Sequence, residues 1–182
     1  EVTGATSVYK QNVASAKDSK VQSIVNDLKE LTAPVFGKVI GTATQTVERG
    51  AGTDWAATAL WQYCQTDLAV INAGGIRAQA FPIYAGDSLL VSTVHTIMPF
   101  DNTVKTVDLK GEDVRTLIYL FVSSANVVRE GDYIYINGEL LDDSKTYSVA
   151  SIDYIFDKPE NPFLKGDNIV ATGVLFRDVL IQ

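Results

Sequence analysis

The sequence predicts an α+β (mixed α/β) fold, in which a mixed β-sheet is packed with helices. Segments with helical spacing of apolar residues interleave with segments of strand character, but without the strict strand–helix–strand rhythm of a parallel sheet. The chain has 182 residues, of which 46% are hydrophobic and 20% charged. That is enough for one well-packed domain and too little for two ordinary ones, so we expect a core that needs no disulfide or metal.

The N-terminal part of the chain predicts a lead-in, a helix and a strand. Residues 1–16 are small and polar, which is typical of a lead-in or linker, so we expect the domain to occupy residues 17–182. After Asp18 the apolar residues recur at helical spacing, which predicts a helix that ends before Pro34. A short strand is expected at residues 38–43.

The next segment predicts a helix followed by a buried strand. Thr53 or Asp54 could cap a helix that runs through Gln65. Residues 68–71 form an uninterrupted apolar run of strand length, and the run stops at Asn72, where a small and polar turn begins.

The second half of the chain alternates further strands and helices. In chain order, the patterns predict a strand at 104–109, a helix at 112–124, strands at 133–136 and 145–150, and a helix at 174–180. A turn near Asn137 and Gly138 is expected to join the two later strands, and residues 157–167 have the composition of a loop.

Charge and hydropathy narrow the possible partners. The net charge is −7 and no dense basic patch is visible, so no nucleic-acid partner is expected. The longest apolar runs are far too short to cross a bilayer, so we expect no membrane segment in this chain. The first residue is Glu1 rather than Met, which indicates a processed or excised piece.

The residues available for catalysis are few. A two-metal hydrolase site needs several His and Asp ligands, and a structural zinc site about four Cys or His ligands, but the sequence has only His95 and Cys64. A carboxylate-only magnesium site needs fewer ligands and stays compatible with the composition. We interpret His95 as a partly buried histidine and Cys64 as a small core residue, and predict no catalytic and no metal-binding residue in this chain.

Two short blocks carry the candidate binding chemistry. In Asn72-Ala-Gly-Gly-Ile-Arg77 a buried strand leads to two glycines, Gly74 and Gly75, which let a ligand approach the backbone. Arg77 offers a planar fork for phosphate or carboxylate. In Met98-Pro-Phe-Asp-Asn102, Phe100 could stack on a flat ligand such as a base or could be an ordinary core residue.

Taken together, these blocks resemble the C-terminal domain of the 5′-nucleotidase and UDP-sugar hydrolase family. The resemblance rests on Ile71-Asn-Ala-Gly-Gly-Ile-Arg-Ala78, Met98-Pro-Phe-Asp-Asn-Thr-Val104 and Val107-Asp-Leu-Lys-Gly111, in that order, and covers about residues 20–180. It implies a substrate-binding and specificity domain that recognises the base and phosphate of a nucleotide, nucleoside or nucleotide sugar.

The resemblance also assigns roles. Asn72 and Arg77 would contact the substrate, with Arg77 on the phosphate, and Phe100 would stack on one face of the base. Tyr154, in place of the family's more common Phe, would stack on the other face. Further candidates stand where the family pattern is degraded: Arg49 for a second phosphate contact and Asp167 for the base or ribose, because Gly50-Ala-Gly-Thr-Asp54 and Lys165-Gly-Asp-Asn168 depart from the family blocks.

Catalysis would then reside elsewhere. The resemblance implies an N-terminal metallophosphoesterase domain, in cis or in trans, that holds two divalent metals, so this chain alone is predicted to be inactive and to need no cofactor of its own. It also implies an extracellular, periplasmic or cell-surface location. The alternatives are a stand-alone nucleoside- or nucleotide-binding module, a metal-free hydrolase that uses His95, and a structural or adhesive domain.

Overall fold

The protein is described by a computed structural model, which covers Gly4 and residues 17–182; the predicted lead-in over 1–16 lies, except for Gly4, outside the described residues. The helices of this part are α1 (Ser19–Phe36), α2 (Arg49–Cys64), α3 (Val91–Ile97), α4 (Gly111–Leu120), α5 (Asp153–Phe156) and α6 (Phe176–Ile181). Three short 3₁₀ turns accompany them: η1 (Ala73–Gly75), η2 (Ala78–Ala80) and η3 (Pro162–Lys165).

The strands of the described chain form three sheets. They are β1 (Val39–Thr42), β2 (Leu68–Ile71), β3 (Ser88–Leu90), β4 (Thr103–Lys110), β5 (Val122–Ser123), β6 (Val127–Glu130), β7 (Tyr133–Ile136), β8 (Glu139–Leu140), β9 (Thr146–Ile152) and β10 (Asp167–Leu175). The central sheet has five strands in the order β10-β4-β9-β2-β5, and β1-β3 and β6-β7-β8 form two smaller sheets.

The central sheet is mixed, which confirms the predicted fold class. Strand β2 runs parallel to β9, whereas β4 is antiparallel to both β9 and β10, and β5 is antiparallel to β2. Helix α2 packs against β2 and β5, and α4 packs against β4 and β9. All four residues of β2 are buried, as its uninterrupted apolar run predicts.

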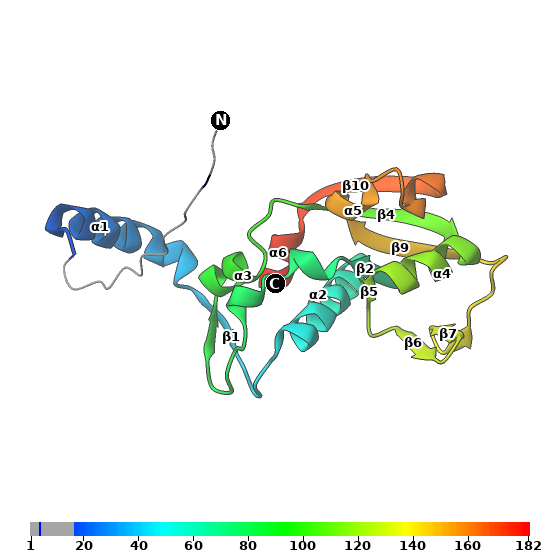
Figure 1. Cartoon of the computed structure of the whole chain (residues 1–182), viewed down its shortest axis with the longest axis horizontal. Coiled ribbons are helices and arrows are strands. Elements are labelled where there is room, and N and C mark those ends of the chain that lie inside the picture. Colours follow the sequence, from blue (N-terminus) through cyan, green and yellow to red (C-terminus); the bar gives the residue numbers. More distant parts are fainter. Residues whose placement is uncertain (1–3, 5–16) are drawn as a thin grey trace.

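The N-terminal helix projects away from this body (Figure 1). Asp18 caps α1, because its carboxylate accepts hydrogen bonds from the backbone N–H groups of Lys20 and Val21 at 2.9 and 3.1 Å. The expected end before Pro34 is wrong. The helix runs on to Phe36, and the Gly37 N–H closes the last turn on the Ala33 carbonyl at 2.9 Å.

Three other boundaries differ from the prediction. Helix α2 begins at Arg49 rather than at Thr53, because Gly50 and Gly52 are part of its first turns instead of a preceding loop. Helix α4 ends at Leu120, and the last residues of the expected helix form β5. The turn at Asn137 joins β7 to β8, and not to β9.

The largest omission from the sequence prediction is β10. This nine-residue strand occupies one edge of the central sheet, and its first seven residues are exposed. Its register against β4 shifts twice, and Asn168 and Gly173 have positive φ angles of 53° and 71°. The last helix consequently starts at Phe176, two residues later than expected.

Candidate functional site

The topology brings three separate chain segments together at one end of the central strands, where β2 and β9 terminate. Because β2 and β9 are parallel, their carboxyl ends meet there, and β4, antiparallel to β9, begins at the same edge. The loop that starts at Asn72, the segment into β4 and the start of α5 therefore converge. In open α/β sheets, ligand sites commonly lie just outside the carboxyl ends of strands.

The loop after β2 packs tightly around its own asparagine. A Cβ added to Gly75 would lie 3.4 Å from Asn72 Oδ1 and 3.7 Å from Met98 Cε, so the missing side chain leaves space for the amide and the buried methionine. Asn72 Oδ1 is buried and accepts no hydrogen bond from the described residues. A buried acceptor without a donor raises the free energy of the folded state.

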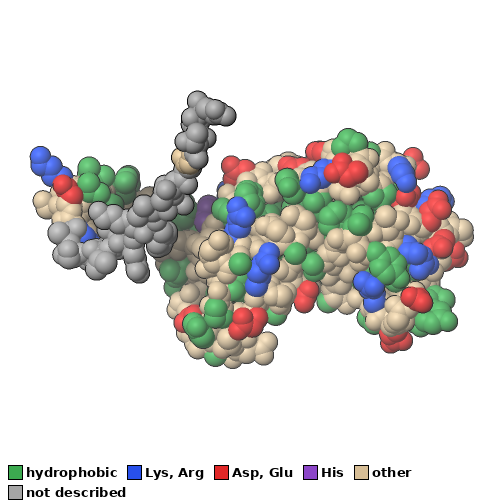
Figure 2. All heavy atoms as spheres, viewed as in Figure 1, with side chains coloured by type: hydrophobic (Ala, Val, Ile, Leu, Met, Phe, Trp, Pro, Cys, Tyr) green, Lys and Arg blue, Asp and Glu red, His purple; other side chains and the backbone are tan. Residues whose placement is uncertain are grey.

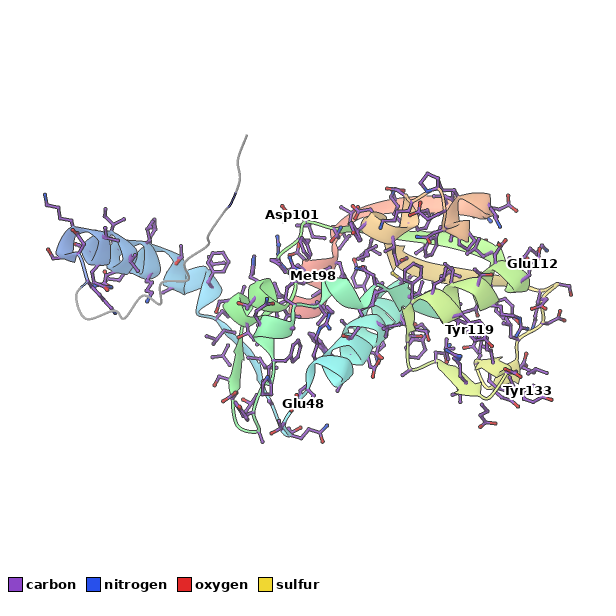
Figure 3. The ribbon with its side chains drawn as sticks, in the orientation of Figure 1. Glu48, Met98, Asp101, Glu112, Tyr119 and Tyr133 are labelled. Carbon is purple, nitrogen blue, oxygen red and sulfur yellow. The ribbon has the colours of Figure 1, made fainter. Side chains whose placement is uncertain are left out.

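Arg77 and Phe100 are in direct contact in the site. The guanidinium carbon of Arg77 lies 4.7 Å from the centroid of the Phe100 ring, within cation–π distance. The Arg77 N–H donates to the Ile97 carbonyl at 2.9 Å, which ties the loop after β2 to the end of α3. Phe100 is 37% exposed, so the ring is not an ordinary core residue. Figure 3 labels Met98 and Asp101, on either side of Phe100 along the chain.

The end of β9 contributes the third wall. Tyr154, in the first turn of α5, is 54% exposed, and Lys158 Nζ lies 4.4 Å from the centroid of its ring. The preceding residue, Asp153, accepts hydrogen bonds from the side-chain amide of Asn102 and from Thr103. These bonds fasten the start of α5 to the start of β4.

These segments enclose a cavity of about 330 Å³. Its lining residues come from the segments at this end of the strands and are Asn72, Gly74, Gly75, Arg77, Phe100, Asn102 and Tyr154. The cavity thus combines two aromatic rings, one arginine, two side-chain amides and a glycine backbone, which suits a flat polar ligand that carries a negative charge.

The structure brings together six of the eight residues that the sequence singles out, namely Asn72, Gly74, Gly75, Arg77, Phe100 and Tyr154. Arg49 lies behind the pocket loop instead of in the cavity lining. Its Nε donates to the Ile76 carbonyl at 3.1 Å and its NH2 group to the Ala73 carbonyl at 2.8 Å. From this position Arg49 supports the backbone that carries the two glycines.

Asp167 is not brought to the cavity either. It is the first residue of β10 and pairs with Asp108, whereas the cavity lies where β4 begins, at Thr103. Five residues of strand separate these two points of β4, or about 17 Å at the usual rise per residue. The physical reason is the antiparallel pairing, which starts β10 at the far end of β4.

Sequence reasoning missed two residues, Asn102 and Asp153. Asn102 lines the cavity, and it stands inside the Pro-Phe-Asp-Asn block that pointed to Phe100. That block was the available signal. Asp153 gives no local signal, because its hydrogen-bond partners Asn102 and Thr103 lie 51 and 50 residues away in the sequence.

His95 and Cys64 lie outside the cavity lining. The His95 ring packs edge-on against Phe36 at 4.8 Å between centroids, and burial, with the nearby Arg177 charge, lowers its pKa. Burial raises the pKa of the Cys64 thiol to about 11, which keeps it protonated and unreactive at neutral pH. Within residues 17–182 no three His, Cys, Asp or Glu side chains cluster in a way that could hold a metal ion. The residues present therefore do not fit a two-metal site.

The fold and the cavity define a class: an α+β domain with a cavity lined by loops at the carboxyl end of two parallel strands of a mixed sheet. Residues 6–135 match the family described as "5'-nucleotidase, C-terminal domain". The chain belongs to this family.

Known proteins agree with this assignment. The 5′-nucleotidase of Vibrio parahaemolyticus is 38% identical over 82 residues, which are 45% of this chain and 14% of that protein. Endonuclease YhcR of Bacillus subtilis is 27% identical over 125 residues, covering 64% of this chain and 10% of that protein. The chain thus spans a small part of these curated relatives.

Solved structures share the fold. The 5′-nucleotidase precursor of Thermus thermophilus matches with a TM-score of 0.71 at 18% identity, over 89% of this chain and 39% of that one. The NAD nucleotidase of Haemophilus influenzae matches with a TM-score of 0.62 at 18% identity, over 90% of this chain and 38% of that one. Within residues 17–182 of this protein, no helix combines the length and the apolar character needed to cross a membrane.

Proposed function

We propose that this chain is the substrate-binding and specificity domain of a 5′-nucleotidase-type hydrolase, and that it recognises the base and the phosphate of a nucleotide or nucleotide sugar. The observation that carries the proposal is one cavity of about 330 Å³ whose lining combines two exposed aromatic residues, an arginine and two glycines. Family membership supports a substrate-binding role for this domain.

Each wall of the cavity has a chemical counterpart in a nucleotide. Phe100 and Tyr154 would stack on the base, each contributing roughly 1–3 kcal/mol. Arg77 would donate to the phosphate, and a hydrogen bond of this charged kind is worth about 1.5–3 kcal/mol. The Arg77 guanidinium lies 4.7 Å from the centroid of the Phe100 ring, so the groups proposed for the phosphate and for the base are neighbours in the cavity lining.

Hydrolysis is proposed to depend on a metallophosphoesterase domain, in cis or in trans, which would hold two divalent metals. The solved Thermus nucleotidase is more than twice as long as this chain, so that relative has room for such a domain. We propose a location outside the cytoplasm, by family resemblance. Without the partner domain the chain is expected to show no phosphatase activity, and turnover of a nucleotide that survives metal chelation would contradict this.

A ligand titration tests the proposal. AMP, adenosine, UMP and UDP-glucose would be titrated by calorimetry or NMR against the wild type, Arg77→Ala and Phe100→Ala. We expect dissociation constants in roughly the high micromolar to millimolar range for the isolated chain. Arg77→Ala should weaken AMP more than adenosine, and Phe100→Ala should weaken both.

The outcomes separate the candidate functions. Absence of binding by the folded full-length gene product would overturn the proposal and favour a structural domain. Binding by a full-length product that lacks a metallophosphoesterase half would favour a stand-alone nucleotide-binding module instead.

Variants of Arg49 can be compared with those of Arg77 in the same titration. Because Arg49 donates hydrogen bonds to two loop carbonyls, Arg49→Ala should weaken the binding of adenosine and of AMP by the same factor. A loss confined to AMP would instead mean that Arg49 contacts the phosphate. Arg49→Lys is the control that keeps the charge but cannot bridge two carbonyls with a planar fork.

A further inference from the structure

Asn102, in the cavity lining, is held by one hydrogen bond to its backbone and one from its side chain. Its backbone carbonyl accepts a hydrogen bond from the Phe176 N–H at 2.8 Å, at the start of α6. Its side-chain Nδ2 donates to Asp153 Oδ1 at 2.8 Å. Asn102 directly follows Asp101, which is labelled in Figure 3 on the connection into β4. Its position in the cavity wall is thus fixed by two elements that are distant in sequence.

The chemistry of Asp153 decides which amide atom is left for a ligand. An ionised carboxylate can only accept hydrogen bonds, so the group of Asn102 that faces it must be the NH2 group. The second oxygen of Asp153 is also occupied, because it accepts from the Thr103 N–H at 2.9 Å and from the Thr103 hydroxyl at 2.7 Å. The amide carbonyl oxygen of Asn102 is left over, and among the described residues none donates a hydrogen bond to it.

Asp153 is held in its ionised form. Burial by itself raises the pKa of Asp153, but hydrogen bonds from Thr103, from Asn102 and from the Tyr154 N–H outweigh it and keep the pKa below its ordinary value. At neutral pH the carboxylate therefore remains an acceptor, and the Asn102 amide keeps one orientation.

We propose that Asp153 is a positioning residue that sets the specificity of the cavity: it turns the Asn102 amide so that its carbonyl oxygen selects flat ligands with a hydrogen-bond donor on their edge. This inference rests on the proposed function, since it concerns the base-binding part of the same cavity. A base that carries an amino group or a ring N–H satisfies this pattern, and the same base with that donor methylated does not.

Pairs of ligands that differ only in this donor provide the test. AMP would be compared with N6,N6-dimethyl-AMP, and UMP with 3-methyl-UMP, by calorimetry on the full-length gene product with a chelator present to prevent turnover. In the wild type, methylation should weaken binding about tenfold for at least one pair. In Asp153→Asn, whose neutral amide can donate as well as accept, the Asn102 orientation is no longer dictated, and the ratio should fall to about twofold or less.

Two further variants separate orientation from stability. Thr103→Val removes the hydroxyl that donates to Asp153 but leaves the Asn102 contact, so the tenfold ratio should persist even if all affinities fall. Asn102→Ala removes the acceptor and should abolish the ratio, and it leaves the two hydrogen bonds from Thr103 to Asp153. This variant also keeps the inference testable if Asp153→Asn does not fold.

The proposed function and the role of Asp153 have different contradicting results. If none of the four nucleotides binds to the wild type, the proposed function fails. If they bind and the wild type shows no preference, or Asp153→Asn keeps the wild-type ratio, the specificity role of Asp153 is overturned while nucleotide binding stands.

Discussion

Helices α1 and α2 are similar in length but differ in how much of each is buried. Within the described structure, α1 has 18 residues and none is buried, whereas five of the 16 residues of α2 are buried. Figure 2 shows hydrophobic side chains exposed on the arm that α1 forms. The regular apolar spacing belongs to α1, where Val21, Leu28 and Leu31 are all more than half exposed.

This difference separates two meanings of an apolar pattern. Periodicity indicates that one face of a helix is suited to burial, but it does not say that the partner is in the same chain. Helix α2 is buried through small residues such as Ala56 and Ala57, which let it approach β2 closely and give only a weak periodic signal. Leu28 of α1 therefore serves as the exposed reference for substitutions at Leu60 and Cys64 of α2.

The largest effect is expected from a truncation in the core. Leu60 of α2 is fully buried, so Leu60→Ala should lower the free energy of unfolding by about 2–5 kcal/mol. Leu28 of α1 is 54% exposed, and Leu28→Ala in the 182-residue chain should change it by less than about 0.5 kcal/mol. Urea unfolding followed by fluorescence measures both, and equal losses would show that α1 is packed as tightly as α2.

A thiol probe compares the same two helices by chemistry. The pKa of Cys64 is raised to about 11, two units above its ordinary value, so alkylation at pH 7.5 should be about a hundredfold slower than at an exposed thiol. The rate should rise with pH up to about 11, because only the thiolate reacts. Leu28→Cys in a Cys64→Ala background supplies the exposed reference, and comparable rates at both positions would contradict the burial of Cys64.

Two glycines of α2 form the next pair. A Cβ on Gly52 would lie 2.3 Å from the Phe81 ring, so Gly52→Ala should cost about 1–3 kcal/mol by forcing that ring to move. Gly50 has no atom within 4 Å of that position, and Gly50→Ala should be neutral or stabilise by up to about 1 kcal/mol. Thermal unfolding of both variants decides whether space or helix propensity dominates at the start of α2.

The smallest effect is expected at the cap of α1. Asp18→Ala removes the acceptor for two backbone N–H groups and should cost about 1 kcal/mol locally. Because α1 contributes no buried residue, the loss should appear as reduced helical signal in far-UV circular dichroism, with an unchanged near-UV melting temperature. A lower global melting temperature would mean that α1 folds cooperatively with the body.

The sequence was sufficient for the elements whose local pattern and final environment agree. The buried run at 68–71 was predicted correctly because neighbouring residues determine it. The start of α2 was not, because its glycines resemble a turn, and Gly52 is explained only by the approach of Phe81. Strand β10 was missed because its exposed residues carry no alternation for a core to impose.

For the cavity, too, local sequence patterns indicated some residues but not how distant segments pair. The blocks around Asn72 and Phe100 indicated residues that do meet in space, since motifs stay local. The parallel pairing of β2 with β9, which links residues about eighty positions apart, determines that Tyr154 joins them. The antiparallel pairing of β10 with β4 places Asp167 at the other end of β4. The contact of Asp153 with Asn102 has no local pattern at all, because it follows from how β4 and β9 pair.

The irregular β10 has a consequence for the behaviour of the protein in concentrated solution. A straight edge strand with free backbone groups is a template on which another copy can add a strand, and such additions begin fibrils and precipitates. The segment Ile169–Thr172 has the apolar and β-branched composition that favours this, and carries no charge. The register shifts on either side of it and the positive φ angles of Asn168 and Gly173 bend the edge at both ends. The length of straight template is thereby reduced to a few residues, so protection from self-association is built into the backbone geometry and does not depend on charge.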